Sequence, residues 1–559
     1  MTLQPLLARK AETLDVPPAI PAIFRRAVER YGEQDFIIDG DRRMTFADVD
    51  RVSGQMARGL IALGLGKSAR VGLLMPNCSD WVLNWLAASR MGALVVCLSS
   101  LYQPREIDYG LKHNDVDTLL ISSRYLTHDY LDRLEKALPG LVEQRSPDLC
   151  LESHPYLRRI VVWGDCDRAW ALRGPDDLFA AAEARPGMTE AFLANVEAQV
   201  TPADDLLIVC TSGTTANPKS VLHTHGSLIR SQWTNTPLVD IRRGDRVYNG
   251  MPFFWVGGFQ RALMPALFEG ATLVFCDQAD TAAVVDTLLN ERVSFINATV
   301  DACRVFRREI IRRGADASFI REGFDPPKDD SGQIIPQARR TGGPLGMTET
   351  FGTHSGETKS EPAPPGKEGN CGRPMPNIER RIVDPETGAV LGPGEKGELW
   401  VRGTTLMRGY YKRERHEVFT PDGFFRTGDL CVIDGDDYLF FHARLGEMIK
   451  TGGANVAPRE VEVVLAAMPG VREAIVFGVP DPRRGEAVVA VVTPTVGAIL
   501  DPEELRQKVR GELSAYKAPS LVVVMEDRDI PRTDSAKPKK HELRERIIRQ
   551  VAEGAAPAG

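Results

Sequence analysis

The sequence predicts an α/β protein of more than one domain, and three observations support this fold class. The chain has 559 residues, more than the roughly 250 to 300 residues at which a single hydrophobic core stops growing. Its composition, 43% hydrophobic and 26% charged, is typical of a globular protein rather than a disordered one. Short β-rich runs alternate with helical patterns along much of the chain, which predicts βαβ units and a largely parallel sheet.

The alternation is clearest near the start of the chain. The strand-like run VGLLMP (71–76) is followed by the helical pattern SDWVLNWLAASRMG and by a second strand-like run at 93–100. The same rhythm recurs at LLIVCTSGTT, at VYNGMPFF followed by QRALMPALFEGATLVFC, and at VSFINATV. We therefore expect a large body that contains several sheets.

The pattern changes toward the C-terminus. Residues 360–395 are rich in Pro and Gly, and the β-rich runs that follow, GELWVRG and 438–442, predict a smaller antiparallel unit. Beyond Arg444, helix, strand, strand and helix patterns follow one another, the last opened by an acidic N-cap, and they predict a compact α+β domain. The last segment, VAEGAAPAG, offers nothing to pack and is expected to be a disordered tail.

Composition argues against several classes of protein. A net charge of −7 provides no basic footprint for nucleic acid or for an anionic membrane. The nine cysteines include no CxxC pair, so reduced and mostly buried thiols are expected rather than a zinc site or a disulfide framework. The N-terminal segment lacks the apolar run of a secretory signal, and no run reaches about 18 apolar residues. We expect a cytoplasmic protein without a membrane span.

The strongest local signal is LLIVCTSGTTANPKS, residues 206–220, an apolar strand that runs into a loop of hydroxyls and glycine. Small residues let backbone amides approach an oxyanion, and hydroxyl groups and the charge of Lys219 can hold phosphate oxygens. A Walker A motif is not satisfied, because Pro218 stands where its second glycine belongs. Taken alone, such a loop could equally be a solvated turn.

Five further segments favour the phosphate loop: GMTET (346–350), GELWVRG (397–403), GFFRTGDL (423–430), ARLGEMIKTGGANVAPREVE (443–462) and PRTDSAK (531–537). In their order and separations they resemble the motifs of the adenylate-forming enzymes, the family of acyl-CoA synthetases, firefly luciferase and the adenylation domains of nonribosomal peptide synthetases. The resemblance spans residues 45–537.

This resemblance implies a fold and a domain plan. The implied fold is a large multi-sheet αβαβα N-terminal domain with a small β-barrel-like subdomain, followed by a small mobile α+β C-terminal domain. The implied parts are an AMP-binding domain (1–442), a hinge (443–447), the C-terminal domain of AMP-binding enzymes (448–550) and a tail (551–559). Gly446 is the implied hinge residue, because glycine can absorb a large backbone change.

The implied reaction is an AMP-forming ligation of a carboxylic acid to coenzyme A. ATP and the acid give an acyl-adenylate and pyrophosphate, and the thiol of coenzyme A then displaces AMP. The implied cofactors are ATP, Mg²⁺ and coenzyme A. An acyl-AMP ligase that loads a carrier protein and a degenerate nucleotide-binding protein are the alternatives, and the oligomeric state, monomer or homodimer, is left open.

The resemblance also implies roles for particular residues. Lys537 would neutralise charge during adenylation, Thr348 would lie near the α-phosphate and the acid, and Lys450 would serve the thiol step. Outside this context, each charged residue reads as an ordinary surface charge, and Lys537 as part of the basic run KPKK. The other implied site residues are Thr211, Ser212, Gly213, Thr214, Thr215, Lys219, Gly346, Met347, Asp429 and Arg444 for ATP, Glu349 for the metal, and Gly452, Gly453 and Ala454 for coenzyme A.

The acid pocket is the part of the site that the sequence specifies least. Where many members of the family carry PxFHxxG, this chain has PFFWVGG (252–258). The segment suggests Phe254, Trp255, Gly257 and Gly258 as pocket residues; Trp255 could equally be structural. Together with Phe253, Phe259 and the apolar run 295–305, it suggests a hydrophobic acid, aliphatic or aryl.

The chain also departs from the family motifs at several positions. Leu345 stands where the family has the tyrosine that packs against adenine, which gives up aromatic stacking, and residues 319–343 lack the SGGAPL element that flanks adenine. These two departures are the reason for keeping the degenerate-protein alternative. The remaining departures exchange one small residue for another: Ala216, Ser220, Ala443 and Ala536.

Overall fold

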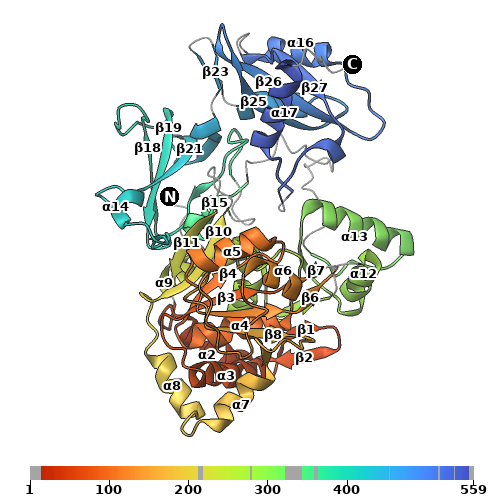
Figure 1. The fold of residues 1–559 in the computed structure, drawn as a ribbon. Helices are drawn as coiled ribbons and strands as arrows, with labels where there is room; N and C mark the ends of the chain where they lie inside the picture. The colour runs from red at the N-terminus through yellow and green to blue at the C-terminus, as the bar shows by residue number, and fades with distance from the viewer. Residues whose placement is uncertain are drawn as a thin grey trace.

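A computed structural model shows a large body, an antiparallel sheet beside it and a C-terminal unit (Figure 1). In the view of Figure 1 the C-terminal unit lies above the other two parts, and the helices α12 and α13 lie on the right of the large body. The structure describes residues 14–126, 128–211, 218–276, 280–321, 343–357, 363–447, 449–451, 454–456, 458–513, 517–533 and 536–552.

The first sheet of the large body has the strand order β20-β11-β10-β4-β3-β5-β8-β9. From β10 to β9 neighbouring strands are parallel, whereas β11 and β20 are added antiparallel at one edge. Strands such as β4 are buried at every residue, as expected where helices cover both faces of a parallel sheet. The strands are β3 (Arg70–Leu74), β4 (Leu94–Cys97), β5 (Thr118–Ser122), β8 (Arg159–Trp163), β9 (Leu172–Gly174), β10 (Asp205–Thr211), β11 (Lys219–Thr224) and β20 (Gly409–Tyr410).

The second sheet has the order β14-β12-β13-β1-β2, in which all neighbours except β1 and β2 are parallel. Its strands are β1 (Asp35–Asp39), β2 (Arg42–Thr45), β12 (Arg246–Asn249), β13 (Thr272–Phe275) and β14 (Phe295–Asn297). The hairpin β6 (Arg124–Tyr125) and β7 (His128–Asp129) forms a separate small sheet.

Helices pack around both sheets of the large body. Helix α3 begins at a capping box, in which Thr45 and Asp48 satisfy each other's backbone N–H groups. The helices are α2 (Ile20–Tyr31), α3 (Phe46–Ala62), α4 (Ser79–Arg90), α5 (Pro104–His113), α6 (Tyr130–Ala137), α7 (Asp176–Ala184), α8 (Glu190–Ala198), α9 (His225–Asn235), η1 (Thr236–Leu238), α10 (Val256–Gly258), η2 (Phe259–Leu263), α11 (Met264–Glu269), α12 (Thr281–Asn290) and α13 (Val300–Arg313).

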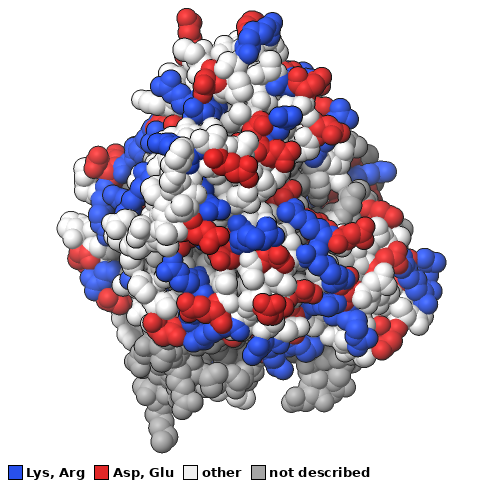
Figure 2. Space-filling view, turned by 90° about the horizontal axis from the view of Figure 1, so that it is seen from below, with Lys and Arg blue, Asp and Glu red and all other residues white. Residues whose placement is uncertain are grey.

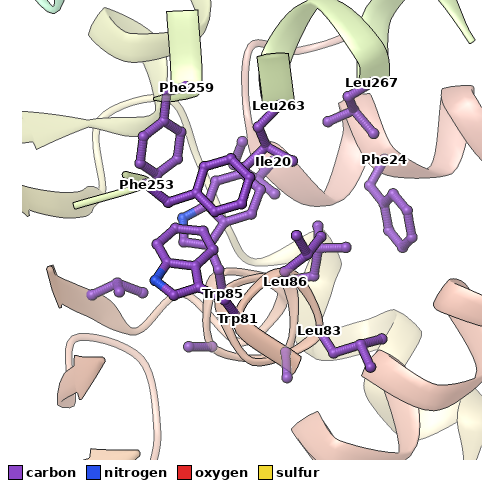
Figure 3. Close-up of a cluster of buried hydrophobic side chains, with 14 of the residues drawn as sticks. Ile20, Phe24, Trp81, Leu83, Trp85, Leu86, Phe253, Phe259, Leu263 and Leu267 are labelled. Atoms are coloured by element: carbon purple, nitrogen blue, oxygen red, sulfur yellow. The ribbon is translucent and has the colours of Figure 1, made fainter. Parts of the chain in front are cut away.

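The largest hydrophobic core lies around helix α4. Trp81 and Trp85 of this helix are fully buried and pack against Phe253 and Phe259 (Figure 3). The ring centroids of Trp81 and Phe253 lie 4.6 Å apart, and those of Trp85 and Phe259 lie 5.4 Å apart. This core fixes the segment that carries Phe253 and Phe259 against the body.

The antiparallel sheet has the order β18-β19-β21-β22, and a smaller sheet, β15-β16-β17, lies nearby in the chain. These elements carry the predicted site residues Gly346, Met347, Thr348, Glu349, Asp429 and Arg444. They are β15 (Leu345–Met347), η4 (Thr348–Thr350), β16 (Gly352–Gly356), β17 (Arg373–Pro374), β18 (Ile378–Val383), β19 (Lys396–Gly403), α14 (Arg415–Val418), β21 (Phe425–Ile433) and β22 (Leu439–Arg444).

The C-terminal unit contains the sheet β24-β23-β26-β25, with β27 parallel to β26. Helix α17 continues to Ala552, two residues into the segment expected as a tail. The elements are η5 (Leu445–Glu447), β23 (Ile449–Thr451), β24 (Ala454–Val456), α15 (Pro458–Ala466), β25 (Val471–Asp481), β26 (Gly485–Pro494), α16 (Pro502–Glu512), β27 (Leu521–Val524), η7 (Asp527–Asp529) and α17 (Lys540–Ala552).

The predicted fold class, a large α/β part followed by a smaller α+β part, is confirmed by this architecture. On the face of the large body seen in Figure 2, basic and acidic side chains are interspersed. Within the described part of the chain, no helix combines the length and the apolar character needed to cross a bilayer.

Candidate active site

The predicted phosphate loop connects two strands of the first sheet. Thr211 ends β10 and Lys219 begins β11, and the two residues are register partners in this antiparallel pair. The Thr211 hydroxyl donates to the Lys219 carbonyl at 3.4 Å, so the two ends of the loop are held together. Four predicted residues of this loop, Ser212, Gly213, Thr214 and Thr215, lie outside the described residues.

The side chain of Lys219 is exposed and lies beside an aromatic ring. Its Nζ atom is 5.1 Å from the centroid of the Tyr410 ring, a distance at which the ring face attracts an ammonium group. Tyr410 comes from β20, which pairs with β11 so that Tyr410 faces Val221. A strand nearly 200 positions away in the sequence therefore supplies the neighbour of Lys219.

The GMTET segment forms strand β15 and the short 3-10 helix η4. A Cβ atom at Gly346 would lie 2.3 Å from the carbonyl oxygen of Gly352, so no residue other than glycine fits there. Met347 precedes the turn, and Thr348 and Glu349 are its first two residues. The close approach of β15 to β16 thus explains why this motif needs its glycine.

Side chains from β11 and α9 hold the GMTET turn in place. His223 donates through Nε2 to the Thr348 carbonyl at 2.8 Å, since a carbonyl oxygen can only accept. Gln232 donates to the Phe351 carbonyl at 2.6 Å, and Ser231 donates to the Thr350 carbonyl at 3.0 Å. Complete burial lowers the pKa of His223 to about 4, so its imidazole is neutral at physiological pH.

Glu349 is bound to the same tyrosine that lies beside Lys219. The Tyr410 hydroxyl donates to Glu349 Oε1 at 2.7 Å, and the Met407 amide donates to the Glu349 carbonyl at 2.7 Å. Burial and the charge of Glu349 raise the pKa of the Tyr410 phenol far above its usual range, and the charge of Arg444 opposes this increase.

Asp429 and Arg444 form an ion pair across strands β21 and β22. They are register partners, and Arg444 Nε lies 2.7 Å from Asp429 Oδ1. The Asp429 side chain is buried, whereas 46% of the Arg444 side chain is exposed. Arg444 also donates to the Thr427 carbonyl at 2.9 Å. Asp429 and Arg444, both predicted to bind ATP, thus lie together.

Two predicted lysines of the C-terminal unit, Lys450 and Lys537, lie on its surface. Lys537 is exposed, and within the described ranges no carboxylate lies at ion-pair distance from its ammonium group. Lys450 is an exposed residue of β23, and Ala454 begins β24. Gly446 lies in η5, where a Cβ would meet nothing within 4 Å. Gly452 and Gly453 fall outside the described residues.

The C-terminal unit touches the antiparallel sheet through charged side chains. Lys396 of β19 lies 3.5 Å from Glu460 of α15, and Glu460 also accepts from Lys517 at 2.6 Å. Burial and the nearby Lys396 lower the pKa of His442 on β22, while Glu460 opposes this decrease. The structure thus shows one arrangement of the two parts, and the swing about Gly446 stays a prediction.

The residues of the segment predicted to line the acid pocket differ in burial: some lie in the core and others are partly exposed. Phe253 and Phe259, which suggested a hydrophobic acid, are fully buried against Trp81 and Trp85, so both belong to the core. Phe254 is buried, and the half-buried Trp255 packs against it with ring centroids 5.3 Å apart.

The two glycines of this segment differ in what they require. A Cβ at Gly258 would lie 2.6 Å from the Pro252 carbonyl, so that position needs glycine for backbone packing. A Cβ at Gly257 would only touch the Met251 side chain at 3.6 Å. Trp255 and Gly257 are thus the two predicted pocket residues that the packing of the core does not require.

Sequence reasoning missed Tyr410 and His223, which contact the predicted site residues Lys219, Glu349 and Thr348. It also missed Ser231 and Gln232, which bind the carbonyls of Thr350 and Phe351 at the end of the same turn. Strand β20 has only two residues, which is too short for a period-2 pattern. His223 carries a signal that could have been noticed, since it follows the phosphate loop on the same buried strand. The contacts themselves depend on long-range pairing that a pattern along the chain does not encode.

The comparisons with known proteins identify the family. The model of the AMP-binding enzyme family matches residues 24–411, and that of the AMP-binding enzyme C-terminal domain matches residues 460–537. The chain belongs to the AMP-binding enzyme family. Within this family it is similar to CoA ligases, so the predicted class, an AMP-forming acid–CoA ligase, is confirmed.

Two relatives and one solved structure illustrate the similarity. The indoleacetate–CoA ligase of Aromatoleum aromaticum is 34% identical over 91% of this chain and 94% of its own length. The 4-coumarate–CoA ligase 1 of Oryza sativa subsp. japonica is 30% identical over 96% of this chain and 94% of its own. The anthranilate CoA ligase AuaEII in complex with anthranoyl-AMP has a TM-score of 0.77 at 23% identity, over 97% of this chain and 99% of that one, and supports the fold.

Proposed function

We propose that this protein joins a hydrophobic, aryl-substituted carboxylic acid to coenzyme A through an acyl-adenylate. In the first step an acid oxygen bonds to the α-phosphorus of ATP, the bond to the β-phosphate breaks, and pyrophosphate leaves. In the second step the sulfur of coenzyme A bonds to the acyl carbon, AMP leaves with the bonding electrons, and the thiol proton is lost. The single observation that carries this proposal is the convergence of Lys219 and Glu349 on Tyr410. The ion pair of Asp429 and Arg444 on the antiparallel sheet adds support.

Each of the proposed site residues would bind a different part of the nucleotide. Thr211 and Lys219 end the loop that would hold the triphosphate, and a lysine there offsets its negative charge. Asp429 would accept hydrogen bonds from the ribose hydroxyls, with Arg444 as the second contact. Gly346 and Met347 would approach the nucleotide through their backbone, because the close packing of β15 leaves no room for a side chain at Gly346. Thr348 would face the α-phosphate and the acid.

A magnesium ion fits the donor set of this site. Among the described residues no group of three or more His, Cys, Asp or Glu side chains could cage a metal. Mg²⁺ commonly needs only one or two carboxylates in addition to phosphate oxygens and water. Glu349 supplies one such carboxylate, with Oε1 held by Tyr410. When bound, the ion would neutralise phosphate charge.

The C-terminal unit would complete the two steps in turn. A carboxylate that approaches a phosphate brings two anions together, and the ammonium group of Lys537 would stabilise that charge. Lys450, with Gly452, Gly453 and Ala454, would line the path of the coenzyme A thiol in a second arrangement. The exposed position of both lysines is compatible with such exchange, because neither is fixed by an ion pair among the described residues.

Support for an aryl-substituted acid comes from the relatives and from the pocket segment. The two relatives described above are named for indoleacetate and 4-coumarate, both of which carry a ring at a distance from the carboxylate. Here the exposed part of Trp255, packed edge-on against Phe254, offers an aromatic surface for such a ring. The location is proposed to be cytoplasmic, and the oligomeric state is open between monomer and homodimer.

A substrate panel tests the proposal directly. The protein is incubated with ATP, Mg²⁺, coenzyme A and, one at a time, indoleacetate, 4-coumarate, anthranilate, octanoate and acetate, and AMP and acyl-CoA are measured. We expect the highest kcat/KM with an aryl-substituted acid and the lowest with acetate. If a holo carrier protein replaced coenzyme A with higher efficiency, the acceptor would be reassigned. No AMP release with any acid and either acceptor would contradict ligase activity.

A further inference from the structure

Tyr410 makes contacts with two proposed functional groups at once. Its hydroxyl donates to Glu349 Oε1 at 2.7 Å, and its ring centroid lies 5.1 Å from Lys219 Nζ. Glu349 and Lys219 come from different elements, η4 and β11. One side chain therefore fixes the spacing between a carboxylate and an ammonium group.

The backbone on both sides of Tyr410 is tied to these same two elements. The Tyr411 amide donates to the Ser220 carbonyl at 2.9 Å, beside Lys219, and the Met407 amide donates to the Glu349 carbonyl at 2.7 Å. Tyr410 itself faces Val221 in the β11–β20 pair. Because the main chain is fixed at both ends, the ring has little freedom to leave Glu349 or Lys219.

The hydrogen bond has a consequence for the carboxylate. A phenol that donates to Oε1 orients the carboxylate plane and leaves Oε2 available for a cation. Partners of this kind, bonded to a metal-binding carboxylate, orient it and commonly account for a 10- to 100-fold difference in metal affinity. The ring face acts separately on Lys219, since the cation–π attraction does not involve the hydroxyl group.

We propose that Tyr410 is a positioning residue that holds Glu349 and Lys219 at the spacing required by a magnesium–nucleotide complex. This inference rests on the proposed function, because it assumes that ATP and Mg²⁺ bind here. The alternative is a tyrosine that only packs: Tyr410 contacts the hydrophobic cluster of the antiparallel sheet, with its ring 6.5 Å from that of Phe425. Replacement by phenylalanine separates the two roles, because it keeps the ring and removes the hydroxyl.

The test compares Tyr410→Phe with Tyr411→Phe. The Tyr411 hydroxyl donates to Asp115 at 3.1 Å, away from Glu349 and Lys219, so it is a matched control. Binding of ATP is measured by calorimetry without acid or coenzyme A, first without divalent metal and then at increasing Mg²⁺. For Tyr410→Phe we expect the Mg²⁺ concentration at half-maximal enhancement to rise about 10-fold or more, with metal-free ATP binding unchanged. Tyr411→Phe should titrate like the unmodified protein.

A second variant, Tyr410→Leu, removes the ring as well. It should weaken ATP binding even without metal, because Lys219 loses its aromatic neighbour, and thermal unfolding confirms that each variant is folded. The role of Tyr410 is overturned if Tyr410→Phe shows the Mg²⁺ dependence of the unmodified protein. If the unmodified protein binds no ATP at any Mg²⁺ concentration, the proposed function is overturned, and this inference with it. The two failures are distinguishable, because only the second one affects the unmodified protein.

Discussion

Asp429 and Arg444 face each other across two antiparallel strands, with Arg444 Nε 2.7 Å from the buried carboxylate of Asp429. The arginine is half exposed and also binds the Thr427 carbonyl. The pair therefore has one fixed, buried acceptor and one partner that reaches solvent. Such an arrangement holds the carboxylate in one orientation, which suits the proposed role of Asp429 as an acceptor for the ribose hydroxyls.

Replacement of Asp429 by asparagine should weaken nucleotide binding more than it weakens the fold. A hydrogen bond to a charged group contributes about 1.5 to 3 kcal/mol, so we expect the Kd for ATP to rise roughly 10- to 100-fold. The loss of stability should be small, because the exposed Arg444 can be solvated. Calorimetry with ATP and thermal unfolding measure the two effects.

The control for Asp429→Asn is Glu379→Gln on β18. Glu379 forms an exposed ion pair with Arg402 on the neighbouring strand of the same sheet. Its replacement should leave ATP affinity unchanged. If both variants lowered the affinity equally, Asp429 would act through the sheet as a whole rather than through the nucleotide.

Lys537→Ala should separate the two half-reactions. Removal of a charge-stabilising group typically lowers a rate roughly 100- to 1000-fold, and we expect this loss in acyl-AMP formation, followed as pyrophosphate release. Thioester formation from added acyl-AMP should stay close to that of the unmodified protein, because Lys537 is not needed when AMP is the leaving group. Lys539→Ala, two residues away, serves as the control and should change neither step.

An equal loss of both steps in Lys537→Ala would contradict the exchange between two arrangements. That result would mean that the loop around Lys537 supports the site in a single arrangement. Thermal unfolding of the variant is needed to show that the loss is not caused by unfolding of the C-terminal unit.

Much of the fold could be predicted because it depends on local patterns. The run at 71–76 and the helical pattern after it correspond to β3 and α4, since periodicity and chain breakers act over a few residues. The site motifs were found as short segments that resemble those of the adenylate-forming enzymes. Gly346 shows the physical reason in one case, because the backbone of Gly352 excludes every side chain there.

Prediction failed where contacts depend on distant pairing. Tyr410 and Glu349 are separated by 61 positions, and the strand that carries Tyr410 has two residues. The apolar segment that contains Phe253 and Phe259 suggested a hydrophobic acid, but an apolar run cannot show whether it faces a ligand or a core. Their burial against Trp81 and Trp85 depends on how helix α4 packs, which the run itself does not contain.

Ala536→Gly should stabilise the loop that carries Lys537. Ala536 has φ of 59°, in the left-handed region that costs a residue with a Cβ roughly 1 to 2 kcal/mol. Glycine removes this cost but adds unfolded-state entropy of about 0.4 to 1 kcal/mol, so a net gain of roughly 0.5 kcal/mol is expected. The unfolding free energy of the protein in urea measures it.

Ala466→Gly, in the same C-terminal unit, should change the unfolding free energy in the opposite direction. Ala466 is exposed at the end of helix α15, where glycine should lower the unfolding free energy by up to about 1 kcal/mol. If Ala536→Gly lowered stability as Ala466→Gly does, the backbone at Ala536 would not be strained in solution.

Protonation of buried histidines should make the fold sensitive to mild acid. Burial lowers the pKa of His223 from 6.5 to about 4 and that of His354 from 6.5 to about 3. A histidine whose folded-state pKa is depressed contributes stability that is fully present above pH 6.5 and is lost as pH falls, because the unfolded chain then binds the proton first. Between about pH 6 and about pH 4.5, each such histidine should lower the unfolding free energy by up to about 1.4 kcal/mol per pH unit.

Unfolding in urea at several pH values, with and without His223→Gln, checks this expectation. The variant should be less stable at neutral pH, since the contact with the Thr348 carbonyl is altered, but its stability should fall less steeply below pH 6, by about one proton. His541→Gln is the control, because 83% of the His541 side chain is exposed, and it should leave the slope unchanged. If the unfolding free energy fell equally steeply with pH for His223→Gln and the unmodified protein, His223 would take up its proton equally in the folded and unfolded states. The neutral imidazole would then not be the only form of His223 in the folded protein at mild acid.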